Sequence, residues 1–178
     1  LDFGCGNGMR TRKFVQDDWQ LCGIDISEES IRIAREDSQN QGLQAKYYIM
    51  DGENMTFRDN QFDLIVDYGA FSSVDMKKAV PDLLRVLKPT GTIIAIETLG
   101  HNPILNIKRK LNVLCGIRTK WSAKHIMKLY DWEKLKNNFH IYKIKFFGVT
   151  TALIAPLIWW VPQRLQNYLI TCCEKIDN

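Results

Sequence analysis

Short apolar runs alternate with amphipathic stretches along the first hundred residues of the chain. The runs are rich in Leu, Ile, Val and Phe, and they predict buried strands at 1–3, 20–26, 45–50, 62–67 and 93–97. The stretches between them repeat apolar residues at helical spacing and predict helices at 9–16, 27–41 and 76–87. This alternation predicts the α/β class: a doubly wound, mostly parallel sheet with helices on both faces.

Beyond residue 97 the pattern predicts mainly helices. They are expected at 104–114, 122–130, 132–138 and 163–176. Ser122 and Asp131 are the expected N-caps of the second and third of these helices. Residues 142–147 alternate apolar and polar side chains and predict a sixth strand near an edge of the sheet.

The C-terminal part of the chain contains a nearly continuous apolar segment, 149–161, which is too short to span a bilayer. We expect a core domain over 1–148, with residues 149–178 packed on it as an apolar segment and a helix. Three roles stay open for 149–161: a helix packed on the sheet, a wall of a lipophilic pocket, or contact with a membrane surface.

The first apolar run leads into a glycine-rich turn, in which Gly4, Gly6 and Gly8 alternate with Cys5 and Asn7. Glycine adopts a positive φ readily, and its missing Cβ lets a ligand lie against bare backbone. A helix N-terminus after the turn adds unpaired N–H groups that suit a carboxylate or phosphate. The spacing, G-x-G-x-G, is one residue shorter than the dinucleotide fingerprint. Strand, turn and helix together predict a ligand-binding corner.

Asp25 ends the second predicted strand, at the same edge of a parallel sheet as the glycine turn. A carboxylate at this edge can accept hydrogen bonds from ribose hydroxyls. The alternative is a loop aspartate that caps the next helix, although Ser27 already suits that cap. We favour ribose binding, because the distance between Asp25 and the glycine turn suits a β-α-β unit.

The glycine turn resembles motif I of the class I S-adenosylmethionine-dependent methyltransferases, in which an acid and a hydrophobic residue precede G-C-G-x-G. Residues 83–94, Leu-Leu-Arg-Val-Leu-Lys-Pro-Thr-Gly-Thr-Ile-Ile, resemble the family's R-x-L-K-P-G-G segment, with Thr90 at the first glycine. The resemblance covers residues 1–97. The resemblance is weaker in the segment after residue 97. That segment is similar to one in methyltransferases of the type 11 group, which is related to quinone and lipid methylation.

The family sheet has seven strands, the last of which is antiparallel and lies between strands five and six. Nothing after Phe147 predicts that strand, and the chain begins within its first strand without an initiator Met. We therefore expect a fragment that lacks N- and C-terminal parts, with strand seven missing and an unpaired edge between strands five and six.

The resemblance implies S-adenosylmethionine as the ligand. In the family, the acid after strand three lies near the adenine amino group, and the residues after strand four line the space between the sulfonium and the acceptor. Carried over to this sequence, the implied cofactor-binding residues are Asp2, Gly4, Cys5, Gly6, Asn7, Gly8, Asp25, Ile26, Asp51, Gly52, Glu53, Asp67 and Tyr68. A polar turn without a ligand is the alternative for Asp51 and Glu53.

Three residues at or just after strand ends are candidate bases or acceptor-orienting groups: Tyr68, Glu97 and His101. His101 suits a general base best, since its unperturbed pKa lies near neutrality. A loop hydrogen-bonding role is the alternative for that residue. A base is needed only if the acceptor must lose a proton. The chain lacks the Asn/Asp-Pro-Pro-aromatic sequence of methyltransferases that act on nucleobase or glutamine nitrogens, which argues against those substrates.

Composition adds limits to this picture. The chain has 178 residues, 46% of them hydrophobic and 25% charged, as in an ordinary globular domain. Its five cysteines show no metal-ligand spacing, so we expect no metal, reduced thiols and a cytoplasmic location, with peripheral membrane contact as an option. Residues 1–100 contain 11 Lys and Arg against 16 Asp and Glu, whereas residues 101–178 contain 13 against 4.

The leading hypothesis is methyl transfer from S-adenosylmethionine to a carbon or oxygen atom of a small lipophilic or phenolic acceptor. The basic second half keeps an RNA methyltransferase open as an alternative, although we expect no nucleic-acid partner. An NAD(P)-dependent oxidoreductase is disfavoured by the shortened glycine spacing. A relative that binds the ligand without turnover also stays open, and the sequence leaves the oligomeric state undetermined.

Overall fold

We describe the protein from a computed structural model, in residues 1–13, 18–98, 100, 103–116, 119–139 and 142–145. The chain divides into two compact units, Leu1–Leu129 and Tyr130–Asn178, and each is described by itself. The predicted segments 149–161 and 163–176 lie outside the described residues. None of the helices in the described ranges combines the length and apolar character that a membrane crossing requires.

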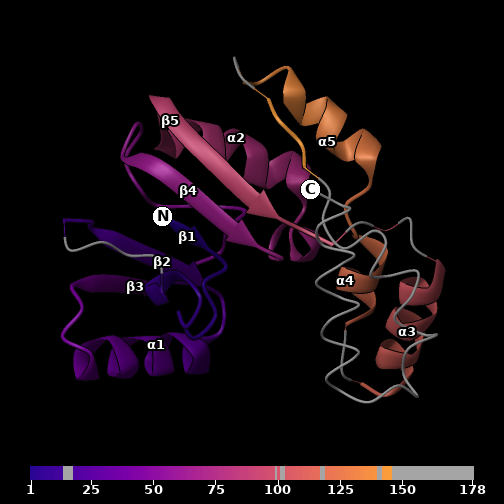
Figure 1. Cartoon of the computed structure of the whole chain (residues 1–178), viewed down its shortest axis with the longest axis horizontal. Coiled ribbons are helices and arrows are strands. Elements are labelled where there is room, and N and C mark those ends of the chain that lie inside the picture. The colour runs from indigo at the N-terminus through magenta and orange to yellow at the C-terminus, as the bar shows by residue number, and fades with distance from the viewer. Residues whose placement is uncertain (14–17, 99, 101–102, 117–118, 140–141, 146–178) are drawn as a thin grey trace, which may run out of the picture. The chain divides into compact units, whose positions relative to one another are not determined.

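The first unit contains a five-stranded sheet in the order β3-β2-β1-β4-β5, and every neighbouring pair is parallel (Figure 1). The strands are β1 (Asp2–Phe3), β2 (Leu21–Asp25), β3 (Ala45–Ile49), β4 (Phe62–Tyr68) and β5 (Leu87–Ile96). The central strand β1 pairs with β2 on one side and with β4 on the other. The chain thus winds outward from β1 in two directions, which confirms the doubly wound α/β class.

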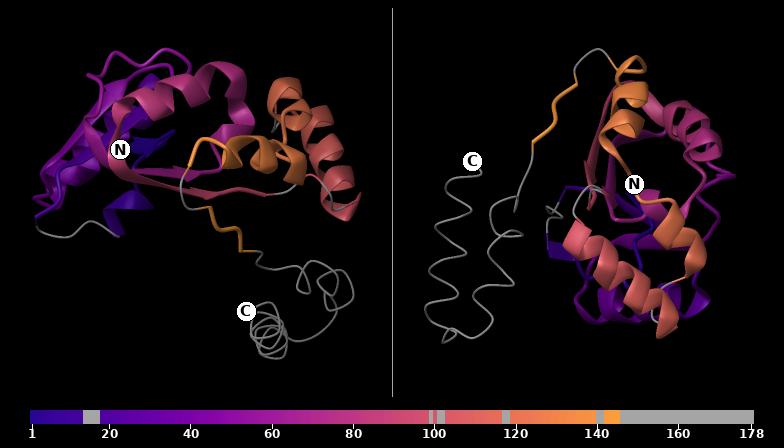
Figure 2. Two further views of the ribbon diagram at one scale, coloured as in Figure 1. Left: turned by 90° about the horizontal axis from the view of Figure 1, so that it is seen from above. Right: turned by 90° about the vertical axis from the view of Figure 1, so that its right-hand side faces the viewer.

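Two helices connect neighbouring parallel strands: α1 (Glu28–Asn40) joins β2 to β3, and α2 (Met76–Val86) joins β4 to β5. Right-handed crossovers that run in opposite directions along the sheet place α1 and α2 on opposite faces. Figure 2 shows α2 running across one face of β4 and β5. Ser27 caps α1 by accepting a hydrogen bond from Ser30 N at 3.3 Å, as its position before the helix predicts.

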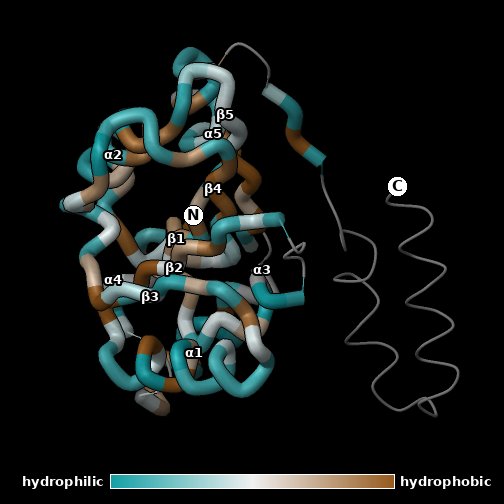
Figure 3. The backbone as a smooth tube through the Cα atoms, turned by 90° about the vertical axis from the view of Figure 1, so that its left-hand side faces the viewer, coloured by the Kyte–Doolittle hydropathy of each residue, from teal (hydrophilic) through white to brown (hydrophobic). Residues whose placement is uncertain are grey.

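The core lies between the strands and these two helices. Phe3, Ile24 and Ile65, one from each central strand, are essentially without exposed surface. Helix α1 buries Ile31 and Ala34, whereas α2 buries its own apolar side chains, Ala79, Leu83 and Val86. Hydrophobic residues accordingly follow the strands in Figure 3, and hydrophilic residues cover much of α1. The apolar runs and the helical spacing of the first hundred residues therefore identify these buried side chains correctly.

Two predicted elements in the first half differ in the structure. The helix expected at 9–16 appears in its described part only as a short 3-10 turn, Thr11–Lys13. Its backbone is held locally, because Met9 N donates to Asn7 Oδ1 and the Arg12 guanidinium donates to Asn7 O. Strand β5 begins at Leu87, immediately after α2, and not at residue 93 as predicted. Its register with β4 shifts between the pairs Phe62–Leu87 and Leu64–Thr92, which forms a bulge.

The second half contains α3 (Pro103–Leu114), α4 (Lys120–Lys124) and α5 (Leu129–Lys136). Helices α4 and α5 begin before Ser122 and Asp131, so neither residue is the predicted N-cap. Ala123 N donates to Thr119 O, which shows that the helical turn starts ahead of Ser122. Residues 142–145 form no strand, contrary to prediction; Ile144 is exposed, so their alternation has no buried face.

Candidate functional site

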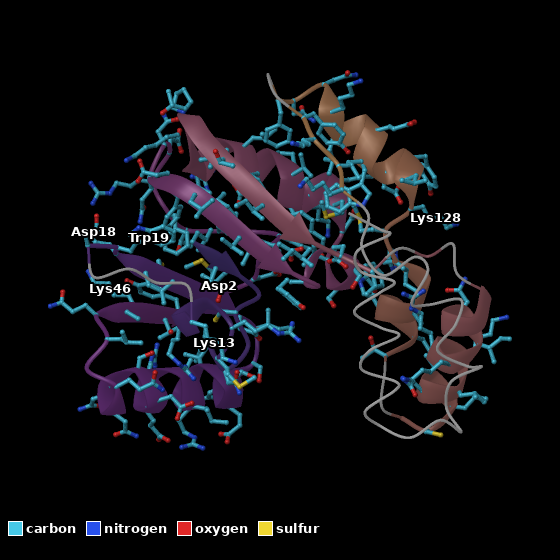
Figure 4. The ribbon with its side chains drawn as sticks, viewed as in Figure 1. Asp2, Lys13, Asp18, Trp19, Lys46 and Lys128 are labelled. Carbon is cyan, nitrogen blue, oxygen red and sulfur yellow. The ribbon has the colours of Figure 1, made fainter. Side chains whose placement is uncertain are left out.

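The carboxyl ends of the three central strands meet at one level of the sheet. Phe3 on β1 is in register with Ile24 on β2 and with Asp67 on β4. The chain leaves β1 at this level, where the winding direction of the sheet reverses, and in open α/β sheets this is the point where ligands bind. Figure 4 marks Asp2 on this central strand. Asp2 itself is 4% exposed, so it lies beneath the edge and not on its surface.

The glycine turn places its three glycines in the left-handed region, with φ of 66° at Gly4, 52° at Gly6 and 68° at Gly8. A Cβ at Gly4 would collide with the Ala70 side chain, and one at Gly8 would lie 2.8 Å from the Tyr47 hydroxyl. A Cβ at Gly6 would meet nothing within 4 Å. Gly4 and Gly8 are therefore required by packing, whereas Gly6 presents bare backbone to open space.

Asp25 connects the glycine turn to the start of α1. Its Oδ2 accepts a hydrogen bond from Gly6 N at 2.8 Å, and its Oδ1 accepts one from Ser27 N at 2.8 Å. Each carboxylate oxygen has a further lone pair, so both can accept a second donor from a ligand. The two roles considered from the sequence therefore coexist geometrically: Asp25 supports the helix start and still presents acceptor capacity beside Gly6.

Cys5 and Asn7, between the glycines, contribute to the turn itself. Cys5 N donates to Ile24 O at 2.9 Å, which fixes the turn to β2. Burial, followed by the charge of Asp2, raises the pKa of the Cys5 thiol well above its usual range, so the sulfur stays protonated and unreactive. Asn7 is exposed and bonds through its Oδ1 to Met9 N. Neither side chain supplies a catalytic group.

The residues around the end of β3 divide into exposed and supporting side chains. Asp51 is exposed and accepts a hydrogen bond from Glu53 N at 2.9 Å. Gly52 is buried, and a Cβ there would collide with the ring of Phe3. Glu53 accepts from Asp75 N at 2.7 Å and pairs with Lys78 Nζ at 3.2 Å; these contacts lower the pKa of Glu53. Glu53 thus anchors the first turn of α2.

Ile26 is the most exposed large apolar side chain at this edge, with 75% of its surface accessible. It follows Asp25 directly at the end of β2 and therefore lies beside the hydrogen-bonded Gly6–Asp25 pair. An exposed isoleucine next to backbone and a carboxylate suits a flat ligand that has one apolar face and hydroxyl groups at its edge.

Two carboxyl groups support the end of β4. Asp67 has no exposed surface, and its Oδ1 accepts hydrogen bonds from Ala70 N at 2.9 Å and Phe71 N at 3.2 Å. Glu97, just after β5, accepts from Ser72 N at 3.1 Å. Burial, followed by the charge of Glu97, raises the pKa of Asp67 to about 8. Asp67 is therefore mostly protonated at neutral pH, and both groups hold the 3-10 turn η2 (Phe71–Ser73).

Tyr68, the residue after Asp67, points to the surface with 46% of its area exposed. The guanidinium carbon of Arg10 lies 3.7 Å from the centroid of its ring, a cation–π contact. This pair joins the segment after the glycine turn to the end of β4. Sequence reasoning missed Arg10; the only signal was a basic residue two positions after the last glycine. His101, the third candidate base, lies outside the described residues.

A model of the methyltransferase domain family matches residues 1–95 of the chain. The ubiquinone/menaquinone biosynthesis C-methyltransferase UbiE of Shewanella sediminis is 33% identical over 117 residues, which cover 62% of this chain and 46% of the relative. The corresponding protein of Pseudoalteromonas translucida is 35% identical over 103 residues, or 54% and 41% of the two chains. The chain thus spans less than half the length of these curated relatives.

Solved structures that are similar to this chain include three with TM-scores above 0.5. An S-adenosylmethionine-dependent methyltransferase of Methanosarcina mazei is 30% identical, with a TM-score of 0.54 over 62% of this chain and 56% of that one. The [4+2]-cyclase SpnF is 28% identical, with a TM-score of 0.51 over 53% and 36%. A methyltransferase of Aquifex aeolicus, at 19% identity and a TM-score of 0.60 over 82% and 73%, shares the fold.

The family match coincides with the described geometry. Residues 1–95 include all of β1 to β4, the glycine turn, Asp25 and most of β5. They amount to more than half of the 178 residues. The chain belongs to the methyltransferase domain family.

Proposed function

We propose that the chain binds S-adenosylmethionine at the carboxyl ends of β1 to β4 and transfers its methyl group to a carbon or oxygen atom of a small lipophilic or phenolic acceptor. The observation that carries this proposal is the Gly6–Asp25 pair. Gly6 has φ of 52° and open space where a side chain would stand, and its N–H holds the Asp25 carboxylate at 2.8 Å. Bare backbone beside a carboxylate suits the ribose of a nucleoside ligand.

The nucleoside would lie over β2 and β3, where Asp25 faces the ribose, and exposed Ile26 and Asp51 face the base. With the nucleoside there, the amino-acid end of the ligand extends toward β4. Arg10 is the cation beside that end: its guanidinium carbon lies 3.7 Å from the centroid of the Tyr68 ring, and a guanidinium has five N–H donors that suit a carboxylate. We assign Arg10 to the ligand's carboxylate.

The acceptor would lie over β4 and β5. Tyr68 and Ile96 are register neighbours on these strands, and 46% and 50% of their surfaces are exposed. An aromatic and an aliphatic side chain together favour a flat, lipophilic acceptor. The names of the two UbiE relatives point to quinone biosynthesis, which fits the same class of acceptor.

S-adenosylmethionine supplies an already activated electrophilic methyl group when bound, so the protein's own task is alignment and exclusion of water. Gly6 and Asp25 fix one end of the ligand and Arg10 the other. Tyr68 then orients the acceptor from the end of β4, with its loop held from below by Asp67 and Glu97. A phenolic acceptor would lose its hydroxyl proton to His101, and an acceptor methylated at a ring carbon would lose the displaced ring proton to the same base, while Tyr68 acts only by orienting the acceptor.

Calorimetric titration of the full chain with S-adenosylmethionine and S-adenosylhomocysteine, with NADH as the control, tests the binding step. We expect binding of the first two ligands and none of NADH. A methyl-transfer assay with phenols and quinones then tests the reaction. Binding of NADH alone would overturn the assignment of the glycine turn.

A second function has one observation in its favour. SpnF, which is 28% identical, is named as a [4+2]-cyclase, so this fold is compatible with a reaction other than methyl transfer. If the chain binds S-adenosylhomocysteine but methylates no acceptor in the screen, this second function would replace methyl transfer while the ligand site remained.

A further inference from the structure

Helix α3 buries polar side chains on one face and exposes large apolar side chains on another. Arg109 is only 8% exposed, and its Nη1 donates to Asn106 Oδ1 at 2.7 Å. Asn106 Nδ2 in turn donates to Gly100 O at 2.9 Å, which fixes this face of the helix to the segment that precedes it. These contacts of the inward face are polar, unlike those of a usual surface helix, whose inward face is apolar.

The outward face carries a stripe of large apolar side chains. Ile107, Leu111 and Leu114 are 62%, 54% and 82% exposed. They stand four and three positions apart, and at about 100° per residue they fall within an arc of about 60°. A stripe of this kind is normally buried against a neighbouring element, yet none of the described residues covers it. Leaving it in water is unfavourable, which indicates an apolar partner beyond the described residues.

Charge defines the chemistry of that partner. Lys108 and Lys110 are exposed and lie on either side of the stripe, about 100° and about 60° from Ile107. Between Glu97 and Asp131 the sequence contains seven Lys and Arg residues and no Asp or Glu. An apolar stripe between lysines, in an acid-free stretch, matches a surface that is anionic outside and apolar within. A membrane that contains anionic lipids has this structure, whereas RNA offers no apolar layer for leucines.

We propose that α3 lies flat on an anionic membrane surface, with Ile107, Leu111 and Leu114 inserted at the level of the acyl chains and Lys108 and Lys110 among the headgroups. This proposal goes beyond the proposed methyl transfer and stands independently of it. Helix α3 follows β5 closely in the chain, and β5 ends at the ligand-binding edge. A lipophilic acceptor would consequently be drawn from the layer on which the helix lies.

Vesicle co-sedimentation of the full chain tests the proposal. The probes are phosphatidylcholine vesicles and phosphatidylcholine vesicles that contain phosphatidylglycerol, each at low and high salt. We expect binding to the anionic vesicles only, and weaker binding as salt rises. No binding to anionic vesicles, or equal binding to both kinds, would overturn the proposal.

Two variants of α3 separate its apolar and electrostatic contributions. Leu111→Gln/Leu114→Gln should weaken binding at least about tenfold, because two buried leucines are lost from the contact. Lys108→Gln/Lys110→Gln should weaken it by about fivefold for each lysine. Glutamine is a good helix former, so α3 should persist in both variants. Lys46→Gln/Lys77→Gln, which removes two exposed lysines from β3 and α2, is the matched control and should bind as the wild type does.

The same variants distinguish other occupants of this surface. If vesicle binding is unchanged in both α3 variants, another surface contacts the lipid and the proposal is wrong. If the chain instead forms dimers that Leu111→Gln/Leu114→Gln dissolves, a second copy of the chain covers the stripe. Salt-sensitive RNA binding without vesicle binding would show that the lysines serve a nucleic acid.

Discussion

The edge at which we propose that the ligand binds has two sides that are built in different ways. The ribose side consists of residues 4–8, 25 and 26. Its shape is set by three glycines with left-handed backbone, and its polar group is the partly exposed carboxylate of Asp25. The acceptor side consists of residues 67, 68 and 97. The buried, protonated carboxyl group of Asp67 and the neighbouring carboxyl group of Glu97 support the loop that follows the exposed Tyr68. If the proposed ligand binds here, the ribose side offers it a surface fixed by the backbone, whereas the acceptor side rests on a carboxyl group whose raised pKa makes it sensitive to pH.

The largest expected effect comes from closing the open backbone on the ribose side. Gly6→Val places a branched side chain in the space that the ligand would occupy, so calorimetry should detect no binding of S-adenosylhomocysteine. Gly42→Val is the matched control, because Gly42 also has positive φ (66°) and no atom within 4 Å of its missing Cβ. Both variants share a backbone strain of about 1–3 kcal/mol. Equal binding by both would show that the turn does not approach the ligand.

Asp25→Ala tests the polar part of the ribose side. It should weaken S-adenosylhomocysteine binding by about 1.5–3 kcal/mol, the range for hydrogen bonds to a charged group. It should also destabilise the fold, since Gly6 N and Ser27 N lose their acceptor. Asp82→Ala is the control: it removes an acceptor from Met55 N and Arg85 in α2, so stability should fall while affinity remains. Unchanged affinity in Asp25→Ala would refute the ribose role.

The acceptor side should show its difference through pH. In the folded protein the pKa of Asp67 is raised to about 8, above its ordinary value near 3.8, so the folded state holds a proton that the unfolded chain releases. Stability is therefore greatest below the lower pKa and falls as pH rises toward 8. Asp67→Asn keeps an oxygen for Ala70 N and Phe71 N and carries no charge, so its stability should vary less with pH.

Urea unfolding of both proteins between pH 5 and pH 8.5 measures this effect, and the two should diverge by at least about 1 kcal/mol across that range. Asp63→Asn is the control on the same strand: Asp63 is exposed, and its bond to Lys88 lowers its pKa. That variant should keep the wild-type decline above pH 5. Parallel profiles for wild type and Asp67→Asn would mean that the buried carboxyl group is ionised.

The two sides also differ in how far the sequence predicts them. The ribose side follows from local signals, because glycines at alternate positions favour a left-handed backbone and Asp25 stands at the end of the next apolar run along the chain. On β4, Asp63 and Asp67 look alike in the sequence, yet the first is exposed and the second has no exposed surface. Their difference comes from η2, which follows Asp67 closely in the chain, and from Glu97, which the fold brings next to both from the end of β5.

The same reason explains the remaining errors. The start of β5 was not predicted as strand, because Lys88, Pro89, Thr90 and Gly91 carry turn signals and form a bulge against β4. Arg10 could not be assigned, since its contact with Tyr68 joins residues from two strand ends. Contacts between residues that follow different strands form only when the sheet is packed. The hydrophobic periodicity of the chain therefore does not predict them.

Arg10→Met gives the smallest expected effect and tests the link between the two sides. Methionine keeps an unbranched stem that can cover Tyr68 but removes the cation. Affinity for S-adenosylhomocysteine should fall by about 1 kcal/mol, the upper range for an exposed ion pair, while 5′-methylthioadenosine, which lacks the carboxylate, should bind as before. Arg58→Met, at an exposed arginine between β3 and β4, should change neither affinity. If Arg10→Met weakened both ligands equally, the arginine would act by supporting the glycine turn, and the carboxylate would be bound by backbone N–H groups.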